Sequence, residues 1–168
     1  MNYQKEIEEV IGDWKEFLLK IFSNLEKAGF DLDEFEELDH IAYRTERLED
    51  YKKMKEKLTM FSKVYSDKVF NGRPILICLL KSPLFFRNFS IEGLEVLAPK
   101  ENNKHKEGLE HAEFVIKIPL AEFMKKYERV DFNLNAYNRE ENPELIVEFG
   151  DCAVKFHEQS LLEVRKLK

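Results

Sequence analysis

Apolar residues recur every three or four positions in the first part of the chain. From Glu6 to Ala28 this spacing is typical of one amphipathic helix, and Gly29 follows it as a helix-ending residue. Asp31 precedes Glu34 by three positions, which resembles the capping box of a short second helix. The apolar face of the first helix is expected to pack on its own domain; the alternative is a face that binds a partner.

The pattern then changes to alternation, which is typical of strands with one buried face. In order, it predicts a strand at 38–45, a helix at 48–60, and strands at 62–70, 74–81 and 89–97. Asn71-Gly72 favours a hairpin turn, because both residues tolerate positive φ. Pro83 is expected to end the strand before it, because proline cannot donate a ladder hydrogen bond. The first half therefore reads β-α-β-β-β.

The second half repeats this order more loosely after a polar loop at 100–107. It predicts a strand at 111–118, a helix at 120–127, strands at 130–137, 145–149 and 153–157, and a terminal helix at 160–168. The predicted fold class is α+β, with two βαβββ modules forming an open cleft. The expected division is an N-terminal helical extension at 1–36 and a paired domain at 37–168, with modules at about 37–100 and 108–168.

Composition narrows the class of partner. Lysine and arginine number 27 against 33 acidic residues, and no basic block occurs, which argues against nucleic acid. No apolar run has the length of a membrane span, and no signal-peptide core is evident. Cys78 and Cys152 lie in apolar strand segments and read as buried thiols of a cytoplasmic protein, although a disulfide is the alternative.

Three of the four histidines lie on predicted strands, which raises the question of a shared metal ion. His40 opens the first module and His111 opens the second, so the two occupy equivalent positions. His157 ends the last strand of the second module, and the fourth strand of the first module carries Glu95 among apolar neighbours. An unpaired buried carboxylate is costly, so Glu95 needs a cation or a metal. His40, Glu95, His111 and His157 are therefore the predicted ligands of a zinc, iron, nickel, manganese or cobalt ion.

Each of these side chains also has an ordinary interpretation. A strand-end histidine is often a hydrogen-bonded surface residue, and Glu95 has the cations Arg73, Lys81 and Arg87 as alternative partners. Glu113 shares a face with His111 and is a candidate general base, an alternative ligand or an ion-pair partner. His105 and Glu148 are expected to face solvent.

Several short segments resemble the YecM-like family of bacterial proteins, in the order and spacing of that family. They are Leu38-Asp39-His40-Ile41-Ala42-Tyr43-Arg44, Asn71-Gly72-Arg73-Pro74-Ile75, Phe89-Ser90-Ile91 running to Glu95, Gly108-Leu109-Glu110-His111, Asn142-Pro143-Glu144-Leu145 and Val154-Lys155-Phe156-His157. The family is similar to the vicinal oxygen chelate fold group, which includes glyoxalase I and extradiol dioxygenases. That resemblance implies paired βαβββ modules and metal ligands from their first and last strands.

The resemblance implies a metal-dependent isomerase, lyase or oxygenase acting on a small anionic substrate. Arg44, Arg73 and Lys155 are the candidate cations for that substrate, with Arg44 and Lys155 ranked first because each shares a face with a predicted ligand. His157 stands where glyoxalases usually have glutamate, and three histidines depart from the dioxygenase pattern of two. The alternatives are a non-catalytic small-molecule binder and an interaction protein with a vestigial site, as a monomer or a homodimer.

Overall fold

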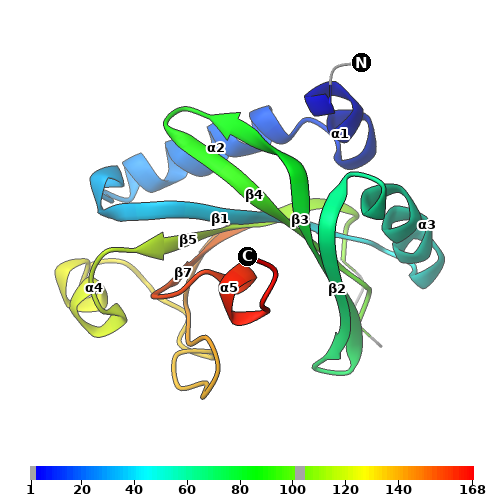
Figure 1. Ribbon diagram of the computed structural model, residues 1–168. Helices are drawn as coiled ribbons and strands as arrows, with labels where there is room; N and C mark the ends of the chain where they lie inside the picture. Colours follow the sequence, from blue (N-terminus) through cyan, green and yellow to red (C-terminus); the bar gives the residue numbers. More distant parts are fainter. Residues whose placement is uncertain (1–2, 101–104) are drawn as a thin grey trace.

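The computed structural model describes residues 3–100 and 105–168, and seven strands in this part form one mixed sheet in the order β2-β3-β4-β1-β5-β7-β6 (Figure 1). The strands are β1 (Phe35–Arg44), β2 (Ser62–Phe70), β3 (Arg73–Phe86), β4 (Phe89–Leu97), β5 (Gly108–Ile116), β6 (Leu145–Phe149) and β7 (Cys152–His157). The helices are α1 (Tyr3–Ile11), α2 (Trp14–Lys27), α3 (Leu48–Thr59), α4 (Leu120–Lys126) and α5 (Leu161–Val164), with a 3-10 turn at Leu32–Glu34. Of the predicted polar loop, residues 101–104 lie outside the described residues.

The middle of the sheet has approximate twofold symmetry. β1 and β5 run antiparallel at the centre, and each has a parallel neighbour from its own half, β4 beside β1 and β7 beside β5. The first half has the complete order β1-α3-β2-β3-β4, and the second has β5-α4-β6-β7. The α+β class with paired modules is confirmed. The two halves share one continuous sheet, and each contributes one of its two central strands, β1 or β5.

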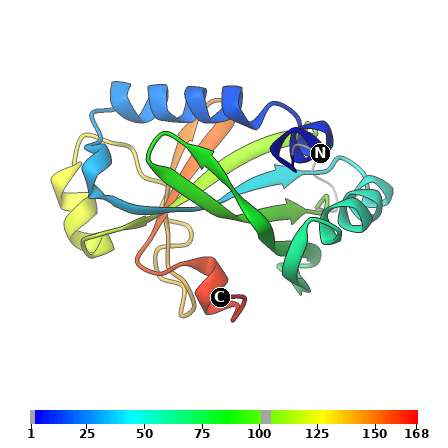
Figure 2. The same cartoon turned by 45° about the horizontal axis from the view of Figure 1, so that its top comes forward.

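Four helices cover one face of this sheet and bury the main core. Figure 2 shows α2, in blue, along one side of the sheet and α5, in red, on the other. The core-facing residues of α2 include Trp14, Leu18 and Phe22, all fully buried. Phe22 packs against Phe114 of β5, which confirms that the apolar helix face packs on its own chain. No helix of the described residues is long and apolar enough to cross a bilayer.

The opposite face of the sheet carries the second row of each alternating strand. Ala42, Ile75, Ile77, Leu79 and Leu97 form a smaller apolar cluster there with Leu162 and Leu167 from the C-terminal segment. The rest of this face holds polar residues that are buried despite their charge. The strand alternation predicted from the sequence therefore places the candidate residues on the face opposite the main core.

Two strand predictions are wrong. Residues 130–137 form no strand and make one bridge, Asn133 to Ile146 of β6, at the position where the first half has β2. That segment reads Val130-Asp131-Phe132-Asn133-Leu134-Asn135, and its asparagines favour local turns, with Asn133 accepting from the Asn135 amide at 3.0 Å. The strand β3 does not end at Pro83, because a register shift between Leu79 and Leu84 accommodates the proline.

The helix boundaries also differ from prediction. The single helix expected at 6–28 is two helices, because Gly12 has φ of 85° and Asp13 starts α2 by accepting from the Glu16 amide at 2.9 Å. Asp31 caps only a 3-10 turn, through the Asp33 amide. The terminal helix expected at 160–168 is confined to Leu161–Val164.

Candidate metal centre and its cavity

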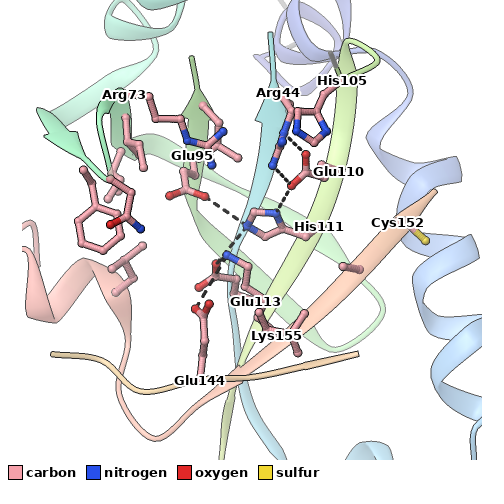
Figure 3. Close-up of a pocket in the computed structure, with 18 of the residues that line it drawn as sticks. Arg44, Arg73, Glu95, His105, Glu110, His111, Glu113, Glu144, Cys152 and Lys155 are labelled. Atoms are coloured by element: carbon pink, nitrogen blue, oxygen red, sulfur yellow. Dashed lines mark hydrogen bonds and ion pairs between the residues drawn. The ribbon is translucent and has the colours of Figure 1, made fainter. Parts of the chain in front are cut away.

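A cavity of about 770 Å³ lies on the polar face of the sheet. Its walls are β1, β3, β4, β5 and β7, and its rim includes α5 and the segment 139–144 before β6. Figure 3 shows Glu95, His111 and Glu113 pointing toward one another inside it. This volume suits a small molecule.

Glu95, His111 and Glu113 line this cavity. Together with the fully buried His40 they form a cluster in which one ligand atom from each residue lies within 4.8 Å of the others. The His111 Nε2 atom is 3.2 Å from Glu95 Oε2 and 3.1 Å from Glu113 Oε1. The His40 Nε2 atom is 3.9 Å from Glu95 Oε2 and 3.4 Å from Glu113 Oε1. The four come from β1, β4 and β5, so the register of the central strands sets their separation.

The orientation of the His40 ring is fixed by Asp39, on the Nδ1 side of the ring. Its Nδ1 atom is 2.7 Å from the carboxylate of Asp39, which also accepts from the Ser160 hydroxyl and, at 3.1 Å, from the Leu161 amide. Asp39 faces its neighbour because β1 has a register shift between Leu38 and His40 in its pairing with β5. The neutral tautomer with a proton on Nδ1 directs the bare Nε2 lone pair into the cluster.

His111 repeats this arrangement in the second half. Its Nδ1 atom is 3.2 Å from Glu110 Oε1, and the same carboxylate pairs with Arg44. Glu110 also lies at a register shift, because Ala42 pairs with His111 and the next residue, Tyr43, pairs with Leu109. An acid-histidine dipeptide thus stands at a bulge in each half, and in both cases the acid holds the Nδ1 side of the ring. Such carboxylate-histidine pairs are the usual support of metal-bound histidines.

Two atoms of the cluster have no hydrogen-bond partner in the described part of the chain. They are His40 Nε2 and Glu95 Oε2, both with essentially no exposed area. A buried acceptor without a partner costs roughly 1–3 kcal/mol, more when it is charged. The donor set of two imidazoles and two carboxylates matches the ligands that zinc, iron, manganese, nickel and cobalt take. The residues therefore fit a divalent metal ion at this point.

His157 belongs to a second, adjoining group. Its Nε2 atom is 2.5 Å from Glu113 Oε2 and 3.6 Å from Glu144 Oε2, and its Nδ1 atom is 3.3 Å from the Pro143 carbonyl. The strand register explains this position. If His40 of the first half is equivalent to His111 of the second, the residue of the second half that is equivalent to Glu95 is Lys155, two residues before His157. Of the four predicted ligands, the structure brings together His40, Glu95 and His111, and Glu113 completes the cluster.

The electrostatic setting keeps the carboxylates of the cluster ionised. Burial alone would raise the pKa of Glu113, but His40, Lys155 and His157 lower it well below its ordinary value. Burial alone would lower the pKa of His111, but the acids beside it raise it to about 9. These acids likewise raise the pKa of His40 well above its ordinary value, against the effect of its burial. The cluster thus stabilises positive charge where its atoms meet.

The three predicted substrate-binding cations all line the cavity. Arg44 pairs with Glu110, and the Lys155 ammonium is 2.9 Å from Glu113 Oε1. Arg73 is buried on β3 and donates from Nη1 to the Ala98 carbonyl at 3.2 Å. In Figure 3 Arg73 lies beside Glu95, while Arg44 lies on β1, the strand next to β4, which carries Glu95.

Sequence reasoning named Asp39, Glu110 and Glu144 only inside the family-like segments and gave them no role. The acid-histidine dipeptide that recurs in the two halves was the available signal for Asp39 and Glu110. Glu144 has no comparable signal, because it reaches the cavity from an irregular segment, where Arg139 Nη1 holds it at 3.2 Å. Glu148 is exposed at the rim and accepts from Asn133 at 3.2 Å.

The family of the chain follows from comparison with known sequences. A family model described as "YecM protein" matches residues 6–167. The chain belongs to the YecM family. A protein from Haemophilus influenzae, described as uncharacterised, is 30% identical over 115 residues, which is 68% of this chain and 60% of that protein. The chain thus spans less than two thirds of the relative's length.

Solved structures confirm the fold of this YecM protein. A structural-genomics target, Protein EC4020, superposes with a TM-score of 0.79 at 21% identity and covers 100% of this chain and 97% of its own. A candidate dioxygenase from Bacillus subtilis superposes with a TM-score of 0.50 at 10% identity, covering 76% of this chain and 42% of its own. The fold is that of the vicinal oxygen chelate group.

Proposed function

We propose that this YecM protein is a metal-dependent enzyme of the isomerase, lyase or oxygenase type, acting on a small anionic molecule in the cavity. The observation that carries the proposal is the pair of unpartnered buried atoms, His40 Nε2 and Glu95 Oε2, directed at the same point as His111 Nε2. His40, Glu95 and His111 are the proposed ligands. A divalent ion bound there would act as a Lewis acid on a substrate oxygen.

Glu113 has a different proposed role, because both of its oxygens are already engaged. Lys155 lies 2.9 Å from Oε1 and His157 lies 2.5 Å from Oε2. His40 Nε2 and Glu95 Oε2, in contrast, have no hydrogen-bond partner among the described residues. A carboxylate held ionised beside the cluster can accept a proton from a bound molecule and share it with His157. Glu113 is therefore the proposed base. His157 becomes the residue that positions Glu113, in place of the fourth ligand predicted from sequence.

The deciding experiment is the metal content of purified protein by mass spectrometry, after incubation with zinc, iron, nickel or manganese and removal of the excess. We expect near-stoichiometric metal in the wild type and its loss from His40→Ala and His111→Ala. His157→Gln is the matched control, since the proposal predicts that it keeps its metal. An unmodified protein that takes up no metal would remove the basis of the proposal.

A non-catalytic binding protein is the second candidate, and one observation favours it. The Lys155 ammonium already supplies a positive charge to Glu113 without a metal ion. If this amine takes the place of a metal, a small molecule would bind equally well to protein treated with a chelator. A screen of small hydroxy and keto acids against metal-loaded and chelated protein separates the two candidates, because only the enzyme consumes the compound.

A further inference from the structure

The cations of the cavity differ in whether a carboxylate of the protein neutralises them. Arg44 pairs with Glu110, and Lys155 pairs with Glu113. Arg139 pairs with Glu144 at 3.2 Å. Arg73 has no carboxylate within ion-pair distance among the residues described, and its Nε atom is buried without a hydrogen-bond partner there. Lys100, Lys106 and Arg165 also line the cavity without such a pair, but they are more exposed. Arg73 is thus the buried arginine of the described residues whose charge remains available to a ligand.

The strand β3 holds Arg73 firmly in this position. The residue follows the Asn71-Gly72 turn, is 9% exposed, and its Nη1 donates to the Ala98 carbonyl at 3.2 Å. That carbonyl belongs to the residue after β4, which is tied to β3 by the Ala98 amide donating to the Pro74 carbonyl at 3.1 Å. One edge of the guanidinium is therefore anchored, and the side chain needs little reordering to bind an anion.

Charge balance indicates what kind of anion fits. The three ion pairs of Arg44, Lys155 and Arg139 each sum to zero. Of the remaining buried charges around the cluster, Asp39 and Glu95 carry two negative charges, which a divalent metal would neutralise. Arg73 then leaves one positive charge in a buried setting, where an uncompensated charge is costly. A ligand with one negative charge would balance it.

The walls next to Arg73 indicate the size and polarity of the ligand. Ile75 and Ile77 follow it on the same face of β3, and Leu97 lies on β4; all three line the cavity. Glu95, a proposed metal ligand, lies on the same side of the pocket in Figure 3. A molecule bound between Arg73 and the metal would be short, with an anionic group at one end and an oxygen close to that group.

We propose that Arg73 is the substrate-recognition residue of this site and binds the carboxylate of a small monocarboxylic acid whose neighbouring oxygen reaches the metal. This rests on the proposed metal centre. It reverses the ranking drawn from the sequence, since Arg44 and Lys155 are occupied by Glu110 and Glu113. An arginine presents two parallel N–H donors to a carboxylate, and hydrogen bonds of this charged type are among the strong ones.

The test uses the protein loaded with Co²⁺, because its visible spectrum changes when an oxygen ligand reaches the metal. The probes are glycolate, acetate, which lacks the hydroxyl, glycolamide, which lacks the charge, and inorganic phosphate. We expect the wild type to bind glycolate in preference to the other three. Arg73→Met should weaken glycolate binding at least tenfold at unchanged cobalt content. Arg47→Gln, on the exposed start of α3, is the control and should bind as the wild type does.

A second variant covers the case in which Arg73→Met does not fold. Arg73→Lys keeps the charge but not the paired donors, and we expect it to weaken glycolate binding by a smaller factor. Equal glycolate affinity in wild type and a folded Arg73 variant would overturn the role of Arg73. Tighter binding of phosphate than of glycolate would overturn the carboxylate class. A wild type that takes up no cobalt would instead overturn the metal centre, and the metal content records this separately.

Discussion

Asp39 is not itself a proposed metal ligand, yet the structure makes metal binding depend on it. Its carboxylate holds His40 Nδ1 at 2.7 Å and accepts from the Leu161 amide and the Ser160 hydroxyl. Asp39→Asn keeps the size of the side chain but replaces one acceptor oxygen with an amide donor. The amide oxygen can still accept from His40 and Leu161 while the amide nitrogen donates to the Ser160 hydroxyl. His40 therefore loses the negative charge that strengthens the hydrogen bond at its Nδ1 atom and makes its Nε2 atom a better ligand.

The size of the effect can be worked from these contacts. Loss of a supporting carboxylate weakens metal binding about 10- to 100-fold in comparable sites, which corresponds to roughly 1.4–2.7 kcal/mol. The lost charged hydrogen bond should also lower the free energy of unfolding by about 1.5–3 kcal/mol. The two losses are separate quantities and need separate measurements.

The assay is a zinc titration against a chelating indicator, beside urea unfolding of the metal-free protein. Ser160→Ala is the control, because it removes a hydrogen bond to the same carboxylate but leaves the His40 contact. We expect Ser160→Ala to lose about 1 kcal/mol of stability and to bind zinc as the wild type does. A folded Asp39→Asn protein with wild-type zinc affinity would refute the idea that the charge of Asp39 supports His40 as a ligand.

Three further predictions follow from other contacts. A Cβ atom at Gly93 would lie 2.6 Å from His40 Cβ and 2.8 Å from the Asp39 carbonyl, so Gly93→Ala should cost about 1–3 kcal/mol of stability by overpacking and weaken zinc binding; unchanged urea unfolding would contradict the close approach. Zinc at about one hundred times its dissociation constant should stabilise the wild type by roughly 2.7 kcal/mol, seen as a higher melting temperature that a chelator reverses, whereas His40→Ala should not respond. The pKa of Asp67 lies below its ordinary value because hydrogen bonds from Lys55 and Tyr51 outweigh its partial burial. Its stabilising effect is therefore complete above the ordinary pKa of 3.8 and is lost as pH falls through the lower folded value. Asp67→Asn should thus cost about 1 kcal/mol at pH 7 and almost nothing near pH 2, and an equal cost at both pH values would contradict this assignment.

Strand alternation predicted the faces of the sheet correctly, because a period of two is enforced wherever one face packs on a core. It therefore placed His40 with Arg44, His111 with Glu113, and Lys155 with His157 on the cavity side, before any tertiary contact was known. The same rule failed at Asp39 and Glu110. Both acids stand at register shifts, and a bulge turns a side chain to the face that simple alternation denies it.

The register between paired strands was the other feature that the sequence pattern could not predict. Equivalence of strand ends suggested that His157 matches Glu95, but the register places Lys155 at that position. A shift of two residues keeps the side chain on the same face and moves it along the strand, so no pattern of apolar and polar residues can detect it. The position of Glu144 could not be predicted for another reason. It depends on the irregular segment before β6, part of which, at 130–137, was predicted to be a strand of the second module.

The proposed ligands are shared between the two halves of the chain, with His40 and Glu95 from the first and His111 from the second. A metal ion bound there would cross-link β1 and β4 of the first half to β5 of the second. If the halves were expressed as separate fragments, each would bring an incomplete set of ligands. Their reassembly should then require metal. Metal uptake by the mixed fragments would show whether the two halves have paired in the native register.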